Sequence, residues 1–93
     1  MIIGYYAVFN YNYYKKIKYG ISINFPDVEG AYTCADNIEN GKKFAKEVLE
    51  LVTCDLKVKD LPKVSTIKEI QLNSNEEIYW IEYETTESEV ERF

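Results

Sequence analysis

Residues 20–41 read GISINFPDVEGAYTCADNIENG, and this stretch decides the fold of the chain. Apolar and polar residues alternate up to Phe25, which is the period of a strand with one buried face. Pro26 cannot donate a hydrogen bond to a sheet, so the strand should end there, and Gly30 supplies the positive φ that a turn often requires. A short extended run follows, and a helix begins near Asp36. The stretch therefore predicts a strand, a turn, a second strand and a helix, in that order.

The segment after this turn carries the signals of one amphipathic helix. Asp36, followed three residues later by Glu39, matches an N-cap with a capping-box partner, which contributes about 1 kcal/mol. Apolar residues then recur at steps of three and four from Ile38 to Leu56, as on one face of a helix. Gly41 lies in this stripe at a cost of about 1 kcal/mol relative to alanine. We interpret it as a point where the helix backbone comes close to the sheet.

The remaining strands are predicted from composition and alternation. Residues 2–11 are rich in β-branched and aromatic side chains and predict a strand that pairs antiparallel with residues 19–25. Residues 77–85 predict the last strand. Before it, residues 65–70 fit either a short helical turn capped by Ser65 or a further strand, and the pattern alone leaves both open. The predicted order is β-β-β-α-β, an α+β fold with the helix on one face of a four-stranded sheet.

Such a sheet leaves its second face without a covering layer. Aromatic residues of the predicted strands should lie on that face, and amphipathic rings on an uncovered sheet indicate a subunit or partner interface. The alternative is that these rings simply line a solvent-exposed sheet. The aromatic residues from which this face would draw are Tyr5, Tyr6, Tyr19, Tyr79, Trp80 and Tyr83.

The composition describes one small globular domain, residues 1–85, followed by an acidic C-terminal tail, residues 86–93. No apolar run approaches the roughly 18 residues needed to span a bilayer. The N-terminus lacks the basic region and cleavage site of a signal peptide, so we expect a cytoplasmic protein whose two cysteines are reduced. The chain contains no histidine, which removes histidine acid–base catalysis and disfavours a zinc site. We predict no cofactor, no metal and no enzymatic activity.

The net charge of −5 is unevenly distributed. Residues 64–93 carry Lys68 and Arg92 against eight glutamates, whereas the rest of the chain is close to neutral. An acidic surface repels phosphate backbones and attracts basic proteins. We therefore expect no direct binding of nucleic acid and no membrane association by this chain, and we expect a basic protein partner.

The order of residues around the turn resembles the N-terminal domain of HicB-like antitoxins. That domain opens with a YxAVFE-type strand, which Tyr6 to Phe9 match, and carries a motif of the form sFPDlpGcfTqGdTleEA. The exit segment from Leu61 to Ser65 is similar to the family's "iP.PS" feature and favours the helical turn over a strand at residues 65–70. The resemblance covers about residues 5–85. The residues that match the central motif are Phe25, Pro26, Asp27, Gly30, Thr33, Asp36 and Glu39.

The resemblance implies a partial RNase H-like fold that serves as a binding scaffold. Its partner would be a small basic ribonuclease toxin of the HicA type, an mRNA interferase that the antitoxin neutralises by covering its active site. Members of this family commonly continue into a DNA-binding domain, whereas this chain ends eight residues beyond residue 85, so we expect no operator binding. Departures from the motif are Ala31 for a cysteine, Ala35 for a glycine and Gly41 for an alanine. We expect a homodimer or tetramer.

Two other functions are considered beside the antitoxin. An active RNase H-like nuclease needs clustered carboxylates on adjacent strands, but the predicted strands carry almost none at central positions, since Asp27 lies in a turn and Glu82 is alone there. The second alternative is a homo-oligomeric scaffold or adaptor with no toxin partner, and a neighbouring gene for a small basic protein would argue against it. From charge alone, the residues expected to contact a partner are Trp80, Glu82, Glu84, Glu87 and Glu89.

Overall fold

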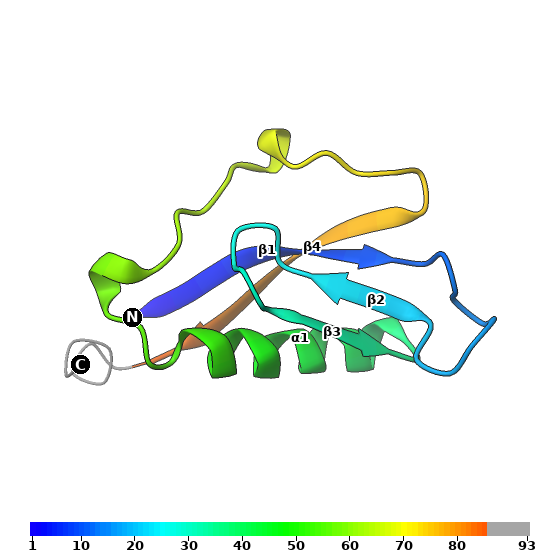
Figure 1. The fold of residues 1–93 in the computed structure, drawn as a ribbon, viewed down its shortest axis with the longest axis horizontal. Coiled ribbons are helices and arrows are strands. Elements are labelled where there is room, and N and C mark those ends of the chain that lie inside the picture. Colours follow the sequence, from blue (N-terminus) through cyan, green and yellow to red (C-terminus); the bar gives the residue numbers. More distant parts are fainter. Residues whose placement is uncertain (86–93) are drawn as a thin grey trace.

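The computed structural model describes residues 1–85, in which one antiparallel sheet is packed against one long helix (Figure 1). The strands lie in the order β3-β2-β1-β4. This arrangement confirms the predicted α+β class and the β-β-β-α-β order. The acidic tail predicted over residues 86–93 lies outside the described residues. The elements are β1 (Ile2–Asn10), β2 (Ile21–Asn24), β3 (Tyr32–Ala35), α1 (Ile38–Thr53), the short 3-10 turns η1 (Val58–Asp60) and η2 (Ile67–Glu69), and β4 (Glu76–Glu84).

Strand β1 is central to the sheet and has very different amounts of pairing on its two sides. It pairs with β4 over its full length, from Ile2 opposite Glu84 to Asn10 opposite Glu76. It pairs with β2 over three residues only. β2 is shorter than the predicted strand 19–25 because Tyr19 has a φ of 57°, which belongs to the loop before the strand. The β1–β4 pairing is therefore the longest in the sheet.

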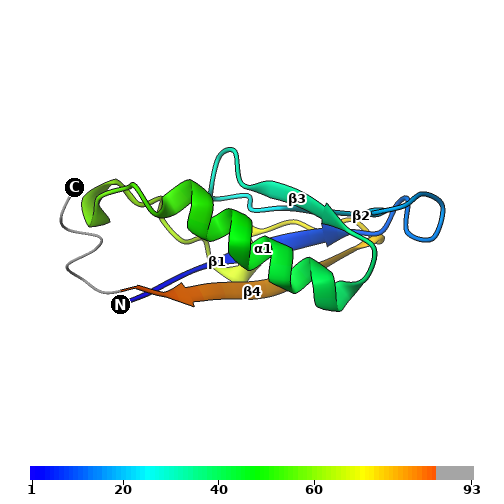
Figure 2. The ribbon, with the colours of Figure 1, turned by 90° about the horizontal axis from the view of Figure 1, so that it is seen from below.

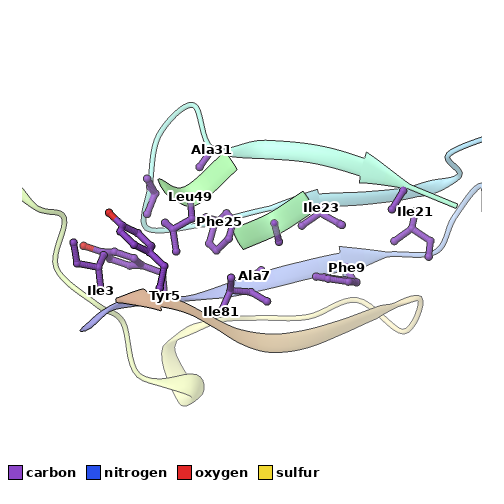
Figure 3. Close-up of a cluster of buried hydrophobic side chains, with 14 residues drawn as sticks. Ile3, Tyr5, Ala7, Phe9, Ile21, Ile23, Phe25, Ala31, Leu49 and Ile81 are labelled. Carbon is purple, nitrogen blue, oxygen red and sulfur yellow. The ribbon is translucent and has the colours of Figure 1, made fainter. Parts of the chain in front are cut away.

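Helix α1 covers one face of the sheet, as Figure 2 shows from the helix side. It contacts the sheet through a stripe of small and aliphatic residues. Gly41, Ala45 and Leu49 are buried in this contact. A Cβ atom at Gly41 would lie 2.8 Å from Cε2 of Phe9 and 3.1 Å from Cδ1 of Ile23. The prediction that Gly41 marks a close approach of helix and sheet is confirmed, and Figure 3 shows the apolar cluster that results.

The start of α1 differs from the sequence prediction. The N-cap is Asn37, whose Oδ1 accepts the backbone N–H of Asn40 at 2.7 Å. Asp36 instead accepts the side-chain amides of both asparagines. With Asn37 as the cap, Glu39 occupies the second helical position, where it cannot reach back to the cap as a third-position glutamate would. The predicted Asp36–Glu39 capping box is therefore wrong.

The helix also ends earlier than the apolar stripe suggested, at Thr53. The Thr53 hydroxyl donates to the carbonyl of Leu49 at 2.7 Å and lies 2.6 Å from the hydroxyl of Tyr83 on β4. This buried contact joins the last turn of the helix to the edge of the sheet. No helix in residues 1–85 combines the length and apolar character that a membrane crossing requires.

The connection from α1 to β4 contains the short helical turn that the resemblance favoured, as η2. Its cap is Thr66, whose backbone N–H donates to Glu69 to complete a capping box. The prediction that Ser65 caps this turn is wrong, because Ser65 bonds Asp27 instead, through Oγ at 2.6 Å and through its backbone N–H at 2.7 Å. Asp27 lies in the turn between β2 and β3. That turn is closed by backbone bonds, which leaves the carboxylate free to hold Ser65.

This connection also changes the second face of the sheet. Figures 1 and 2 agree that the later part of this connection, residues 65–75, runs on the opposite side of the sheet from α1. Val8 points to that side, because it alternates with the helix-facing Ala7 and Phe9, and yet it is only 5% exposed. The second face is therefore partly covered, contrary to the prediction of a bare sheet.

The aromatic residues predicted for the second face are divided between three places. Tyr79 and Tyr83 alternate with Trp80 and Glu82 along β4 and point to the helix side. Tyr5, opposite Ile81 on β1, points to the same side, and Tyr5 and Tyr83 are buried there. Tyr5 donates its hydroxyl proton to the carbonyl of Pro62. Tyr19 is exposed in the loop before β2, and only Tyr6 and Trp80 lie on the side away from the helix. Alternation along the strands correctly separates the helix-side tyrosines from Tyr6 and Trp80. Which of these two sets α1 covers is decided by contacts between residues distant in sequence.

Candidate partner-binding surface

The strongest candidate surface is centred on Trp80, in the middle of β4. Trp80 lies directly opposite Tyr6 of β1, with ring centroids 4.9 Å apart and an interplanar angle of 70°. This edge-to-face geometry is favourable for aromatic pairs. Trp80 is nevertheless 45% exposed. A large ring is thus held on the sheet while much of its surface faces solvent.

Two further contacts fix the orientation of the Trp80 ring. A Cβ atom at Gly4 would lie 2.3 Å from Cζ2 of Trp80, so the ring occupies the space that a side chain would take in most strands. The indole Nε1 donates to Oε1 of Glu82 at 2.7 Å. A ring held by Tyr6, Gly4 and Glu82 loses little conformational freedom on binding, which favours its use as an anchor in an interface.

Acidic residues border this ring. Glu82 lies opposite Gly4, and Glu84 lies opposite Ile2, which is 59% exposed. Neither β1 nor β4 contains a lysine or arginine. We refer to Ile2, Tyr6, Trp80, Glu82 and Glu84 together as the Trp80 face. It combines an apolar centre with negative charge, and it includes three of the residues suggested from the sequence as partner contacts, Trp80, Glu82 and Glu84.

The other two residues predicted to contact a partner, Glu87 and Glu89, lie outside the described residues. The predicted motif residues are placed elsewhere, at β2, β3 and the start of α1. Phe25 is buried in the core and Gly30 has a φ of 84° in the β2–β3 turn. Pro26 belongs to the same turn, whereas Thr33 lies in β3. These residues serve the fold, and the structure does not bring them together with Trp80.

Carboxylates that could serve nuclease chemistry are engaged in other contacts. Both oxygens of Asp27 accept hydrogen bonds from Ser65, and one oxygen of Glu82 accepts the Trp80 indole. Within residues 1–85, no group of three or more histidine, cysteine, aspartate or glutamate side chains is placed to hold a metal ion.

The structure also shows an apolar groove that the sequence did not predict. It lies between α1 and the β3 edge and is lined in part by Tyr19, Cys34, Phe44 and Leu51. Leu51 is 74% exposed. Phe44 packs against the core from one side of the groove, whereas Leu51 is left exposed at its rim.

The fold places the chain among small α+β domains in which one helix packs on a four-stranded antiparallel sheet. No protein-family profile matches the chain, and no curated protein sequence matches it. Among solved structures, a chain of a toxin–antitoxin complex from Streptococcus pneumoniae is similar, with a TM-score of 0.75 and 22% sequence identity. The match covers 88% of this chain and 69% of that chain. At this level of identity, the similarity establishes a shared fold.

Proposed function

We propose that this protein is a HicB-like antitoxin that neutralises a small basic toxin of the HicA type by binding it, and that it has no catalytic activity. One observation carries the proposal, namely that the chain shares its fold with a chain of a toxin–antitoxin complex. The exposed Trp80, bordered by glutamates, supports it. The resemblance of the motif around Pro26 and Asp27 to HicB-like proteins supports the finer assignment.

The Trp80 face suits a basic partner for two physical reasons. A tryptophan held in place by its neighbours can be buried with little loss of entropy, and such residues are enriched among those that dominate binding energy. Glu82 and Glu84 add negative potential around it, which accelerates the encounter with a positively charged protein. An RNA-cleaving toxin needs positive charge to hold its substrate. Covering that charge with the Trp80 face would block access of RNA.

The absence of catalysis is part of this proposal. A nuclease of the RNase H type requires carboxylates that are free to hold two metal ions. Asp27 is instead bound through both oxygens to Ser65, and Glu82 is bound to Trp80. These contacts support a structural role for Asp27 and a binding role for Glu82.

Co-expression tests the proposal directly. The proposal predicts that a small basic protein is encoded next to this chain. That protein should arrest growth when it is expressed alone, and co-expression of this chain should restore growth and yield a complex on purification. Trp80→Ala should abolish the rescue, whereas Leu51→Ala in the groove on the other side of the molecule should preserve it. If wild-type protein neither co-purifies with that partner nor restores growth, the antitoxin assignment is wrong.

A second candidate is a homo-oligomeric scaffold without a toxin. The groove beside α1 supports it, because Leu51 is 74% exposed there and apolar exposure of this kind is common at subunit contacts. Sedimentation of the purified chain separates the two functions. A dimer or tetramer that Leu51→Glu dissociates, together with no binding to the basic protein, would favour the scaffold. A homodimer or tetramer that still binds this protein is compatible with the antitoxin.

A further inference from the structure

Strand β4 forms one edge of the sheet and is unusually long for an edge. It contains nine residues and is in continuous register with β1, with no bulge, whereas β3 at the opposite edge contains four. Proteins normally protect edges of this length with proline, lysine, a bulge or a covering segment. β4 contains no proline or lysine. Its outer side is therefore able to accept another strand.

The hydrogen bonds at both ends of the β1–β4 ribbon show which backbone groups point outward. Met1 and Thr85 exchange two bonds of 2.8 Å, and Tyr11 donates its N–H to the carbonyl of Asn75 at 2.9 Å. Odd-numbered residues of β4 therefore face β1, because hydrogen-bonded and non-bonded pairs alternate along an antiparallel ladder. The N–H and C=O groups of Ile78, Trp80 and Glu82 point away from the sheet, and no other residue in the described part of the chain bonds to them.

The charge of β4 indicates what kind of strand would bind there. β4 carries Glu76, Glu77, Glu82 and Glu84 and no positive residue. Pairing two copies of β4 would bring eight carboxylates together along one two-stranded ribbon, and like charges on neighbouring strands are destabilising. A strand with lysine or arginine at alternate positions would place its charges beside these glutamates. The edge therefore disfavours self-pairing and suits a basic strand.

We propose that the outer edge of β4 binds an extended basic segment of the toxin partner as a fifth strand of the sheet. This inference rests on the proposed function and adds the mode of binding to it. Trp80 and Glu82 contribute twice, since their side chains lie on the Trp80 face while their backbone groups point off the edge. Main-chain bonds would provide affinity, and the alternating side chains would provide specificity.

A proline substitution isolates the backbone contribution. Glu82→Pro removes an N–H that points outward and leaves the bonds to β1 in place, as proline is tolerated on the free side of an edge strand. Glu82→Ala removes the same side chain and keeps the N–H. With the basic protein encoded next to this chain as the probe, we expect Glu82→Pro to bind at least tenfold more weakly than Glu82→Ala. Glu29→Gln, in the exposed β2–β3 turn, is the control for net charge.

Amide hydrogen exchange on the wild-type complex provides a readout that does not depend on the variants folding. The amides of Ile78, Trp80 and Glu82 should exchange at least a hundredfold more slowly in the complex than in the free protein. Those of Tyr79 and Ile81, already bonded to β1, serve as an internal reference. Protection of the three outward amides that rises with the concentration of the free protein would identify a second copy as the occupant and overturn the proposal.

The remaining outcomes separate this proposal from the antitoxin assignment. If the wild-type complex forms but its three outward amides stay unprotected, and Glu82→Pro binds as Glu82→Ala does, the edge is not the docking site and the antitoxin function stands. If wild-type protein does not bind the basic protein at all, both the proposed function and the edge proposal fail.

Discussion

The carboxylate of Asp27 holds Ser65, which follows it by 38 residues, through two hydrogen bonds of 2.6 and 2.7 Å. Asp27 belongs to the turn between β2 and β3, whereas Ser65 belongs to the connection that crosses the other side of the sheet. The contact therefore ties together two segments with no strand pairing of their own. It also gives the Asp27 carboxylate a structural role.

Asp27→Asn should destabilise the fold by about 2 kcal/mol, because an amide cannot accept both bonds and hydrogen bonds to a charged group are worth roughly 1.5–3 kcal/mol. Ser65→Ala should cost less, about 1 kcal/mol, since it removes only the hydroxyl bond. Urea unfolding followed by circular dichroism measures both. Glu29→Gln in the same turn is the matched control and should unfold as wild type. Equal midpoints for Asp27→Asn and Glu29→Gln would contradict a tie at Ser65.

Gly41→Ala should destabilise the protein although alanine is the better helix former by about 1 kcal/mol. The added Cβ atom would meet Phe9 at 2.8 Å, and overpacking of this kind typically costs about 1–3 kcal/mol. A double-mutant cycle with Phe9→Leu tests the cause. The double variant should lose less stability than the sum of the two single variants, since the smaller side chain makes room. Strict additivity would show that the ring is not the obstacle.

The elements of this fold could be predicted from the sequence because their signals are local. The alternation up to Phe25, the stop at Pro26 and the helical stripe containing Gly41 each depend on a few neighbouring residues. The N-cap was misplaced by one position because Asp36 and Asn37 are almost equally good caps, and only the helix geometry decides between them.

The site was less predictable because its properties depend on distant contacts. Alternation separates Tyr83 from Trp80 but does not say which of them faces α1. Trp80 is exposed, and Tyr83 is buried against Thr53, because α1 packs on the face of the sheet that carries Tyr83. The position of β4 at an edge is likewise a property of the sheet as a whole, so no pattern within residues 76–84 could reveal it.

Gly4→Ala should displace the Trp80 ring without altering the ring itself. A Cβ atom at Gly4 would overlap the indole at 2.3 Å, so the ring must rotate away from the sheet and lose its bond to Glu82. Trp80 is the only tryptophan in the sequence, and its fluorescence therefore reports this change alone. Its emission maximum should shift to the red, and affinity for the basic partner should fall at least fivefold. An unchanged emission spectrum would show that Gly4 does not hold the ring.

The protein should lose stability above about pH 10. Burial raises the pKa of Tyr83 from its ordinary value of 10.0, and the bond to Thr53 opposes this in part. Burial, and then the charge of Asp27, also raise the pKa of Tyr5. A phenol with a raised folded-state pKa contributes stability that is complete below pH 10 and is lost as pH rises through the folded-state value. Urea midpoints between pH 7 and 11 measure this loss.

Tyr83→Phe provides the control for this alkaline effect. It should cost about 1 kcal/mol at pH 7 through the lost bond to Thr53, yet its stability should fall less steeply than that of wild type above pH 10. The remaining slope would come in part from Tyr5. If the variant and wild type lose stability in parallel up to pH 11, titration of Tyr83 does not govern the alkaline unfolding.

The negative charge of the Trp80 face should act mainly on the rate of association with a basic partner. Charges separated by more than about 8 Å are screened at physiological salt, so steering by Glu82 and Glu84 is strongest at low salt. The double variant Glu82→Gln, Glu84→Gln should associate several-fold more slowly at low salt and should respond less to added salt. Trp80→Ala should instead raise the dissociation rate, because it removes buried contact area and leaves the long-range field unchanged. Stopped-flow measurements over a range of salt concentrations separate the effects on the association and dissociation rates. If the association rate of the double variant depends on salt as that of wild type does, the steering charges lie elsewhere on the molecule.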